Sequence, residues 1–382
     1  MEQFKCPLCQ SLNTKLYLTT QTSVASDGQH VDMPINAYWC NDCQTLSKSH
    51  LGCEASSHVI DSIYNRYTLH SVGTSQETKV LFNVHAGGIT KSKYNYLKLK
   101  ENIDIKSTGK LLDIGCHYGS FLQNFHDGFP FWHLYGVDVS DRFKSKVESI
   151  SENTHFTTSP ISKLAENFDI IVVTHVLEHI ADLPELLASL YNKLASNGVL
   201  YLQTNNLESN YFLPIIYEQY YNFTPNGLTN LLAGYGFEVM HLDTTTLPKE
   251  MTLICKKAEP KKFKPKQCEH ALEENIRLLK KIDFQLKQYA NSSMPLYILG
   301  TTYVARWLAA NYGLNIVGYL DEDTSSLNQL IEGVAVMPPA QANKDIPVIL
   351  PFPIEQAKQI SQKLEHNFGL TSLVPPFSQE LL

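Results

Sequence analysis

The chain has 382 residues, a length that favours two or three domains, and its 43% hydrophobic content indicates a globular protein. A formal net charge of −7 offers no basic surface for a nucleic-acid backbone, so we do not expect nucleic acid as a partner. No apolar run approaches the ~18–20 residues that span a bilayer, and the first residues lack the apolar core of a signal peptide. We therefore expect a cytoplasmic protein with no membrane contact.

Four of the eight cysteines form two C-x-x-C pairs, Cys6 with Cys9 and Cys40 with Cys43. Each pair can aim two thiolates at one point, and strand-like segments at 15–20 and 35–39 predict facing hairpins. Disulfides are improbable in a reducing compartment, whereas four thiolates suit a closed, structural Zn²⁺ site. Residues 1–70 are therefore predicted to be a zinc-ribbon domain.

Strand-like runs alternate with helical stretches over residues 110–255, which predicts a layered α/β sheet. A strand over 110–114 leads into a glycine-containing turn and then a helix, and a second strand ends at Asp138. A glycine turn lets the backbone approach a ligand closely, and an acid at that strand end can accept hydrogen bonds from ribose hydroxyls. By itself, this pattern fits a dinucleotide or any other adenosine ligand.

Two later segments narrow the choice of adenosine ligand. Residues 168–180 are predicted to be a buried strand that ends in a polar turn, and residues 194–204 supply another turn and the next strand. In order and spacing, these motifs resemble the class I SAM-dependent methyltransferases, which have a glycine-rich turn, an acid after strand two and a Glu-His pair after strand four. His117 stands where that family usually has the middle glycine of the turn.

The resemblance implies a Rossmann-like methyltransferase domain over residues 71–257 with S-adenosyl-L-methionine as its cofactor. The turn residues would face the methionine end, Asp138 would hold the ribose, and the segment 158–161 would contact the adenine. His179 belongs to the Glu-His pair, which either orients its turn or takes part in catalysis. The cofactor-binding residues implied in this way are Asp113, Gly115, His117, Gly119, Asp138, Val139, Ser159 and His175.

The last third, residues 258–382, is predicted to hold a linker, a helix and a small α/β domain. The stretch 256–266 has six lysines and two prolines, which favours a solvated linker over an anionic-ligand or membrane-surface patch. A helix is predicted over 268–289, and strands over 296–299, 316–320 and 347–350 indicate a degenerate Rossmann-like unit. Its first turn has only Gly300, so a second SAM or NAD site is not expected, and a docking or substrate-shaping role is favoured.

In this order of units, the whole chain resembles the sugar C-methyltransferases that act on nucleotide-linked keto-deoxysugars. The resemblance implies that a base removes a C–H proton beside a ketone and that the enolate attacks the SAM methyl. That family has an E-H-x-x-Y-F stretch before a helix that starts F-[ST]-P; here it reads Glu218-Gln219-Tyr220-Tyr221-Asn222-Phe223. Gln219 cannot act as a base, which leaves Glu218 as the candidate and Tyr217, Tyr220 or Tyr221 as donors to an oxyanion.

Two other functions stay open from the sequence. One is an O- or N-methyltransferase for a small metabolite or glycan precursor, since a hydroxyl or amine needs a weaker base than carbon. The other is a non-catalytic scaffold that binds SAM or a sugar nucleotide, which Gln219 and His117 favour. The sequence does not predict the oligomeric state.

Overall fold

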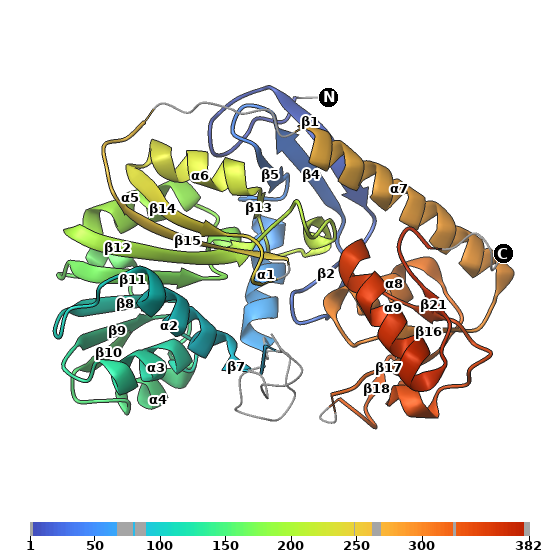
Figure 1. Ribbon diagram of the computed structural model, residues 1–382. Coiled ribbons are helices and arrows are strands. Elements are labelled where there is room, and N and C mark those ends of the chain that lie inside the picture. Colours follow the sequence, from blue (N-terminus) through green and yellow to red (C-terminus); the bar gives the residue numbers. More distant parts are fainter. Residues whose placement is uncertain are drawn as a thin grey trace.

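The computed structural model describes residues 3–66, 79–80, 89–247, 249–261, 269–323 and 326–377. Three β-sheets organise these residues (Figure 1), and helices cover the two larger ones. The sheet formed mainly by N-terminal residues lies at the top of the view in Figure 1, between the central unit on the left and the C-terminal unit on the right.

The N-terminal sheet is antiparallel and has the order β1-β4-β5-β13. The strands predicted at 15–20 and 35–39 are confirmed as β1 and β4, but β13 comes from far along the chain. A small β2-β3 ribbon, a second ribbon of β6 and β7, and helix α1 accompany this sheet. The bounds are β1 (Thr14–Thr20), β2 (Ser23–Val24), β3 (His30–Val31), β4 (Ile35–Cys40), β5 (Thr45–Lys48), α1 (Glu54–Arg66), β6 (Lys79–Val80), β7 (Ile89–Thr90) and β13 (Tyr221–Phe223).

The central sheet has the strand order β10-β9-β8-β11-β12-β15-β14. Strands β8 to β12 are parallel; at one edge β15 runs antiparallel to them, and β14, antiparallel to β15, runs in their direction again. The predicted α/β sheet is confirmed. Its strands are β8 (Lys110–Ile114), β9 (His133–Val137), β10 (Thr154–Thr157), β11 (Phe168–Thr174), β12 (Leu194–Asn205), β14 (Phe237–Asp243) and β15 (Glu250–Lys257).

Helices cover both faces of this sheet because successive strand residues point to opposite sides. Leu111 packs with side chains of α2 and α3, whereas Leu112 joins the cluster that contains α5 and α6. The predicted helix start at Phe223-Thr224-Pro225 is confirmed, since the Thr224 side chain caps α6 by accepting from the Gly227 N–H. The helical elements are α2 (Lys91–Asn102), α3 (Ser120–Gly128), η1 (Asp141–Phe143), α4 (Lys144–Glu148), η2 (Ile161–Lys163), η3 (Leu177–His179), α5 (Leu183–Lys193), η4 (Leu213–Ile215) and α6 (Pro225–Gly234).

The C-terminal sheet has the order β18-β19-β17-β16-β20-β21, with all neighbours parallel except β18 and β19. The predicted helix at 268–289 is confirmed as α7, apart from Cys268, which lies outside the described residues. The elements are α7 (Glu269–Ser292), β16 (Leu296–Leu299), α8 (Tyr303–Tyr312), β17 (Ile316–Leu320), β18 (Leu330–Ile331), β19 (Val334–Met337), η5 (Pro339–Gln341), β20 (Val348–Ile349), α9 (Ile354–Phe368) and β21 (Ser372–Leu373).

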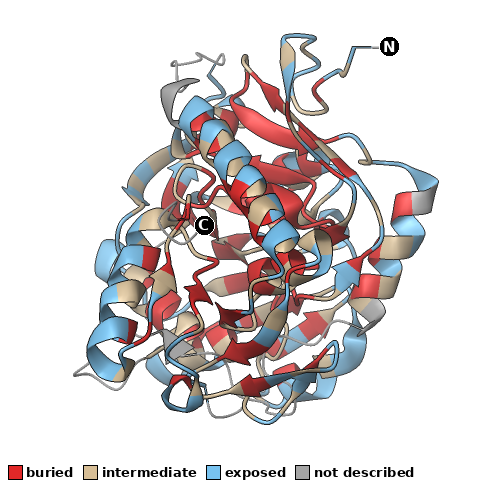
Figure 2. Cartoon of the chain, turned by 90° about the vertical axis from the view of Figure 1, so that its right-hand side faces the viewer, coloured by how far each residue is buried: buried red, intermediate tan, exposed pale blue. Residues whose placement is uncertain are grey.

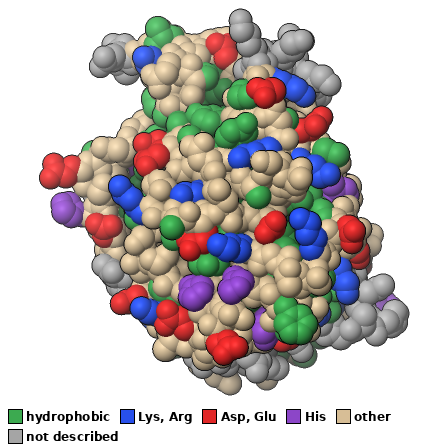
Figure 3. All heavy atoms as spheres, turned by 90° about the vertical axis from the view of Figure 1, so that its left-hand side faces the viewer, with side chains coloured by type: hydrophobic (Ala, Val, Ile, Leu, Met, Phe, Trp, Pro, Cys, Tyr) green, Lys and Arg blue, Asp and Glu red, His purple; other side chains and the backbone are tan. Residues whose placement is uncertain are grey.

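The strands form the interior and the helices the surface. Figure 2 shows strands that are mostly buried and helices that alternate between buried and exposed residues. On the face shown in Figure 3, acidic and basic side chains are interspersed, without a large patch of one sign. Within the described residues, no helix is both long and apolar enough to cross a membrane.

The predicted domain limits stay a prediction. The limit at residue 70 and residues 262–266 of the lysine-rich stretch fall outside the described residues. The structure adds that the N-terminal sheet is not built from residues 1–70 alone, because β13 pairs with β5 through Tyr221, Asn222 and Phe223. The N-terminal and central units are therefore joined by a shared sheet.

Helix α6 lies directly against the second C-x-x-C turn. A Cβ at Gly227 would lie 2.2 Å from the Gln44 carbonyl oxygen, whereas one at Gly234 in the same helix would meet nothing closer than 4.0 Å. We therefore expect Gly227→Ala to lower the free energy of unfolding by about 1–3 kcal/mol, the usual cost of overpacking. Gly234→Ala is the matched control and should be neutral or slightly stabilising, and chemical denaturation measures both. Equal stabilities for the two variants would contradict this contact.

Candidate functional site

The carboxyl ends of β8 and β11 lie side by side at the point where the strand order of the central sheet reverses. In open α/β sheets, ligands bind in the crevice outside such a switch point. Two turns meet there, since a Cβ at Gly115 would lie 2.5 Å from Cγ2 of Val176. The absence of a side chain at Gly115 is what allows the turn after β8 to approach the turn after β11.

The turn after β8 is held by backbone hydrogen bonds in an unusual conformation. The Gly115 N–H donates to the Val137 carbonyl at 2.7 Å, and the Gly119 N–H to the Cys116 carbonyl at 2.8 Å. Both glycines have left-handed φ angles, +74° and +75°, and so does His117 at +46°. His117 adopts a backbone conformation that glycine adopts more readily, which fits its place at the family's usual glycine position.

Two carboxylates sit beside this turn. Asp138, just after β9, accepts a hydrogen bond from the His117 N–H at 2.9 Å. Asp113 is buried, and burial together with the neighbouring Asp138 raises its pKa well above the usual value. Burial lowers the pKa of His117 to about 4, so its imidazole is neutral at pH 7 and packs against the Tyr118 ring.

The remaining residues expected around the adenine lie at the same sheet edge. Val139, two residues after β9, is 77% exposed, unusually so for a large apolar side chain. Ser159 follows β10, is exposed and donates its N–H to the Thr157 hydroxyl oxygen at 3.0 Å. These positions are those that the sequence motifs predict, and their roles in binding stay a prediction.

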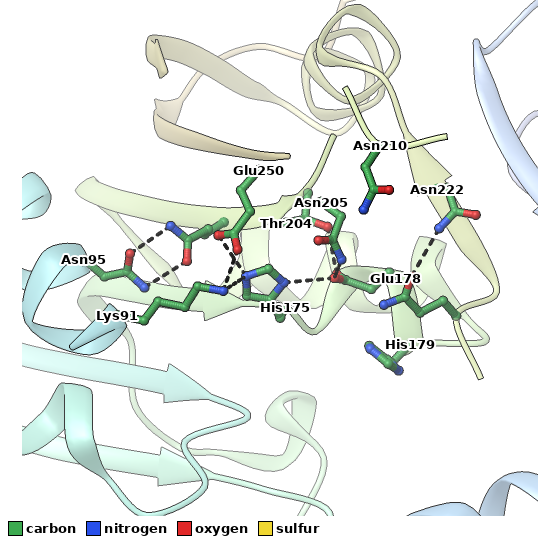
Figure 4. A network of polar contacts seen from close by, with 12 residues as sticks. Lys91, Asn95, His175, Glu178, His179, Thr204, Asn205, Asn210, Asn222 and Glu250 are labelled. Carbon is green, nitrogen blue, oxygen red and sulfur yellow. Dashed lines mark hydrogen bonds and ion pairs between the residues drawn. The ribbon is translucent and has the colours of Figure 1, made fainter. Parts of the chain in front are cut away.

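His175 stands at the end of β11 in a network of charged groups (Figure 4). Its Nδ1 lies 3.4 Å from Glu178, and its Nε2 lies 3.2 Å from Glu250 and 2.9 Å from the Lys91 ammonium. Lys91 also pairs with Glu250 at 2.6 Å. Burial and Lys91 lower the pKa of His175, but Glu250 and Glu178 outweigh them, and the net effect is a raised pKa.

Charged neighbours, His175 among them, lower the pKa of both carboxylates of the network. Burial raises the pKa of Glu250, but Lys91 and His175 outweigh it and bring the value to about 2. Glu178 is almost fully buried and accepts from the Thr204 hydroxyl at 2.9 Å and the Asn205 amide at 3.3 Å. Burial raises the pKa of Glu178, but His175 and His179 outweigh burial and the net effect is a lowered pKa. The edge beyond β11 is therefore a polar, charged and ordered surface.

Sequence reasoning missed Lys91 and Glu250. Lys91 opens α2, before the first strand of the central sheet, and Glu250 opens β15, where an acid at the start of an antiparallel strand follows no motif. Asn95, on the next turn of α2, exchanges two side-chain hydrogen bonds with Gln203 at 2.8 and 3.1 Å. Only the helical i, i+4 spacing of Lys91 and Asn95 hinted that they share a face.

The catalytic candidates before α6 lie deep between units. Glu218 is fully buried; its Oε1 accepts from the Ser26 N–H at 2.7 Å, and its Oε2 has no hydrogen-bond partner in the described part of the chain. The Tyr217 hydroxyl donates to Ser56 at 3.0 Å, and the Tyr221 hydroxyl to the Ala181 carbonyl at 3.0 Å. Both tyrosine hydroxyls are thus already donating to the protein.

Lys48 and His50 surround this buried segment. The Lys48 ammonium donates to the Ile216 carbonyl oxygen, and burial lowers the pKa of Lys48 to about 7 although Glu218 raises it. The His50 ring stacks on Tyr217 with centroids 4.3 Å apart, and burial and Lys48 lower its pKa to about 4. Glu218 therefore belongs to a buried cluster that includes Lys48, whose pKa is lowered to about 7.

Asn222, from the altered family motif, lies near the Glu-His pair Glu178 and His179 in Figure 4. The Nδ1 atom of His179 lies 3.1 Å from the Tyr64 hydroxyl of α1. The Asn222 amide donates to the Gln219 side-chain oxygen at 3.3 Å. Gln219 and Asn222, which replace the His and Tyr of the family motif, thus bond to one another.

The four predicted metal ligands are clustered. The Sγ atoms of Cys6, Cys9, Cys40 and Cys43 all lie within 4.8 Å of one another, with 3.5 Å between Cys6 and Cys43. Each C-x-x-C pair is followed by a glutamine with a left-handed φ, and each glutamine N–H donates to the carbonyl of the first cysteine at 2.9 Å. The two turns are structurally alike and face one another.

A family model described as "Methyltransferase domain" matches residues 91–242, which include both turns and the network around His175. Residues 91–242 of this chain are therefore similar to a methyltransferase domain. The matched segment begins at Lys91, so α2 is part of the domain. The expected class I methyltransferase fold of the central unit is confirmed, whereas the match says nothing of the residues before 91 or after 242.

Two curated proteins match parts of the chain. An uncharacterised protein of Haemophilus influenzae is 32% identical over 102 residues, 24% of this chain and 40% of that protein. A carboxy-S-adenosyl-L-methionine synthase of Campylobacter hominis is 28% identical over 103 residues, 25% of this chain and 44% of that protein. The chain therefore matches less than half the length of each relative. A SAM-dependent methyltransferase from Clostridium acetobutylicum aligns with a TM-score of 0.37 and 14% identity, covering 45% of this chain and 93% of that one.

The charge network makes a prediction about His175. Glu250→Gln removes a carboxylate 3.2 Å from Nε2, so we expect the pKa of His175 to fall, because Lys91 and burial then act against Glu178 alone. Histidine ring signals followed by NMR across a pH titration measure this. Glu148→Gln on α4, which removes a half-exposed carboxylate 3.9 Å from Lys144, is the control and should leave the His175 pKa unchanged. An unaltered pKa in the Glu250 variant would show that Glu250 does not act on His175.

Proposed function

We propose that this protein is a SAM-dependent methyltransferase whose acceptor is a nucleotide-linked keto-deoxysugar, methylated at carbon through an enolate. The observation that carries the cofactor part is the left-handed turn Gly115–Gly119 beside Asp138, at the switch point of a matched methyltransferase domain. The acceptor and the carbon position rest on the resemblance of the whole chain to the sugar C-methyltransferases. The partial curated matches support the cofactor class rather than the acceptor.

The residues at the switch point suit SAM. A Cβ at Gly115 would lie 2.5 Å from Cγ2 of Val176, so glycine lets the two turns meet at the edge where the methionine end would lie. Asp138 can accept from ribose hydroxyls, and the exposed Val139 gives the adenine an apolar surface. When bound there, SAM supplies an electrophilic methyl group and departs as S-adenosylhomocysteine.

The chain has two groups that could take the acceptor's proton. Glu218 matches the family position, and its buried Oε2 has no hydrogen-bond partner in the described part of the chain. His175 lies at the carboxyl end of β11, ordered by Glu178 and Glu250. We assign Glu218 as the base for carbon acceptors, with Tyr217, Tyr221 and His179 as positioning groups around it.

The alternative is methylation of oxygen or nitrogen in a small metabolite or glycan precursor. One observation favours it: Gln219, at the place of the family's histidine, is occupied by a hydrogen bond with Asn222 and cannot accept a proton. A hydroxyl or amine acceptor can lose its proton to His175 at the sheet edge, without any role for Glu218. The base used therefore separates the two functions.

We also propose that the cysteine cluster holds one structural Zn²⁺. A tetrahedral Zn–S₄ site with bonds of about 2.3 Å has sulfur atoms about 3.8 Å apart, close to the 3.5 Å between Cys6 and Cys43. Four cysteines leave no open position on the ion. Its role would be to fix the two turns and, through Gln44, the start of α6.

Methyl-labelled SAM and a panel of nucleotide-linked keto-sugars test the function. We expect label on a sugar carbon, and Glu218→Gln to lower kcat by about 10²-fold or more if Glu218 is the general base. Label on oxygen or nitrogen, with His175→Asn as the inactive variant, would establish the alternative. SAM binding without turnover on sugars or small metabolites would leave a binding scaffold. Asp138→Ala should abolish SAM binding in every case, with Asp141→Ala as control, and full affinity in the Asp138 variant would overturn the cofactor site.

Metal analysis tests the zinc proposal. We expect about one Zn²⁺ per chain, because one four-sulfur site closes one coordination shell. Cys40→Ser should lower both the zinc content and the unfolding midpoint. Cys53→Ser is the matched control, since Cys53 is exposed and outside the cluster, and it should change neither. A zinc-free protein with unchanged stability would contradict the proposal.

A further inference from the structure

The C-terminal sheet has its own switch point. β16 pairs on one side with β17 and on the other with β20, all parallel, so the strand order reverses between β16 and β20. The turns that follow these two strands, 300–302 and 351–353, lie at the same sheet edge. Gly300 in the first turn has a φ of +79°, and Thr302 caps α8 by accepting from the Ala305 N–H. This arrangement resembles the switch point at the carboxyl ends of β8 and β11, but the turn lacks the glycine-rich sequence found there.

A pocket of about 280 Å³ opens at this edge. Its walls come from three parts of the chain: the β2-β3 ribbon, the residues flanking β12 and β15, and both switch-point turns of the C-terminal sheet. The residues that matter chemically are Asp27, Asn210, Lys249, Thr301, Thr302 and Arg306. This volume is near the lower end for small-molecule sites, which suits one part of a larger ligand.

Two cations line the pocket without a carboxylate partner. Within the described residues, neither Lys249 nor Arg306 has a carboxylate oxygen within 4 Å. The Arg306 Nε donates to the Thr301 carbonyl oxygen at 3.1 Å, which directs the guanidinium along the first turn. Burial lowers the pKa of Lys249, so placing this lysine here has a cost that a bound anion would offset.

The acidic residue of the pocket does not neutralise these cations. Both carboxylate oxygens of Asp27 accept from Gln29, from its N–H at 3.0 Å and its side-chain amide at 2.7 Å. The Thr302 hydroxyl and the first N–H groups of α8 add donors on the same side, whereas the Thr301 hydroxyl donates to the Asp321 carboxylate at 3.2 Å. Donors and positive charge thus dominate the opening, which is the chemistry that binds phosphate groups.

We propose that this pocket binds the diphosphate of a nucleotide-linked acceptor, with Lys249 and Arg306 as its cationic ligands. The inference rests on the proposed function for the identity of the acceptor, but the pocket and its charges do not depend on it. No covalent step takes place here; the site holds one end of the ligand.

The pocket is connected to the edge of the central sheet where His175 lies. Lys249 precedes Glu250, which pairs with Lys91 and lies 3.2 Å from His175. Asn210 donates to the Tyr303 hydroxyl at 3.1 Å, which joins the segment after β12 to the start of α8. A ligand anchored by its diphosphate in the pocket can therefore extend its sugar towards the edge of the central sheet. This gives the C-terminal unit a role in positioning the acceptor.

Calorimetric titration of the full-length protein tests the proposal with uridine diphosphate, thymidine diphosphate and inorganic pyrophosphate, and with uridine as the uncharged comparison. We expect the diphosphates to bind, with an affinity that falls as salt rises, and uridine not to bind. Arg306→Met and Lys249→Met should each weaken diphosphate binding about tenfold or more. Lys358→Met, on the exposed face of α9 in the same unit, is the control and should bind as the wild type does.

Two results would overturn the proposal: no binding of any diphosphate, or equal binding by the wild type and the double variant of Lys249 and Arg306. S-adenosylhomocysteine binding is measured on the same samples, and it should be unchanged in the pocket variants because they leave the central turn intact. It also shows that these variants are folded. Failure of S-adenosylhomocysteine binding with intact diphosphate binding would count against the proposed function and not against this pocket.

Discussion

The backbone pairing of residues 206–223 with the N-terminal part of the chain holds the molecule together. After β12 the chain leaves the central sheet, and it returns only at α6. Between them, Ile216 bridges to Val24 of the β2-β3 ribbon, and β13 adds a fourth strand next to β5. Because every buried backbone group needs a partner, this excursion can exist only where the N-terminal sheet supplies one. The buried Glu218 lies within this excursion, and Asn210 and Phe212 of the same segment line the pocket beside the C-terminal sheet.

The fold of the central unit could be predicted from the sequence because its signals are local. A strand, a glycine turn and a helix follow one another within residues 110–128, and the Thr224 cap and Pro225 mark the start of α6. The C-x-x-C spacing likewise predicted that the four cysteines cluster, as the structure shows. In each case, residues a few positions apart decide the structure.

The rest of the site could not be predicted because it depends on contacts between distant residues. Almost all strands of the central sheet lie between Lys91 and Glu250 in the sequence. No motif spacing predicts that the two side chains meet at His175. Glu218 was predicted from a motif, but its burial against Ser26 depends on a ribbon nearly two hundred positions earlier. The second switch point has a single glycine, and only the strand order shows it.

Some of the buried charged side chains lie where the units meet. Lys48 is fully buried, and Glu218 and Lys249 lie in the contacts between the ribbon, the central sheet and the C-terminal unit. Buried charges without full pairing are expensive, and stable proteins keep them mainly where a ligand or a reaction uses them. Lys48, Glu218 and Lys249 lie at contacts between units, whereas Asp113 and Glu178 are buried within the central unit.

The pairing of β5 with β13 also bears on how the chain is made. The N-terminal sheet joins residues 45–48 to residues 221–223, about 175 positions apart. At about 5–20 residues per second, β5 leaves the ribosome about ten to thirty-five seconds before the strand that covers its edge. During that interval β5 has an open edge, and the pairing of β1, β4 and β5 and the clustered cysteines hold the first hairpins together. A metal ion bound by the cysteines at that stage would stabilise the N-terminal sheet during synthesis, before β13 pairs with β5.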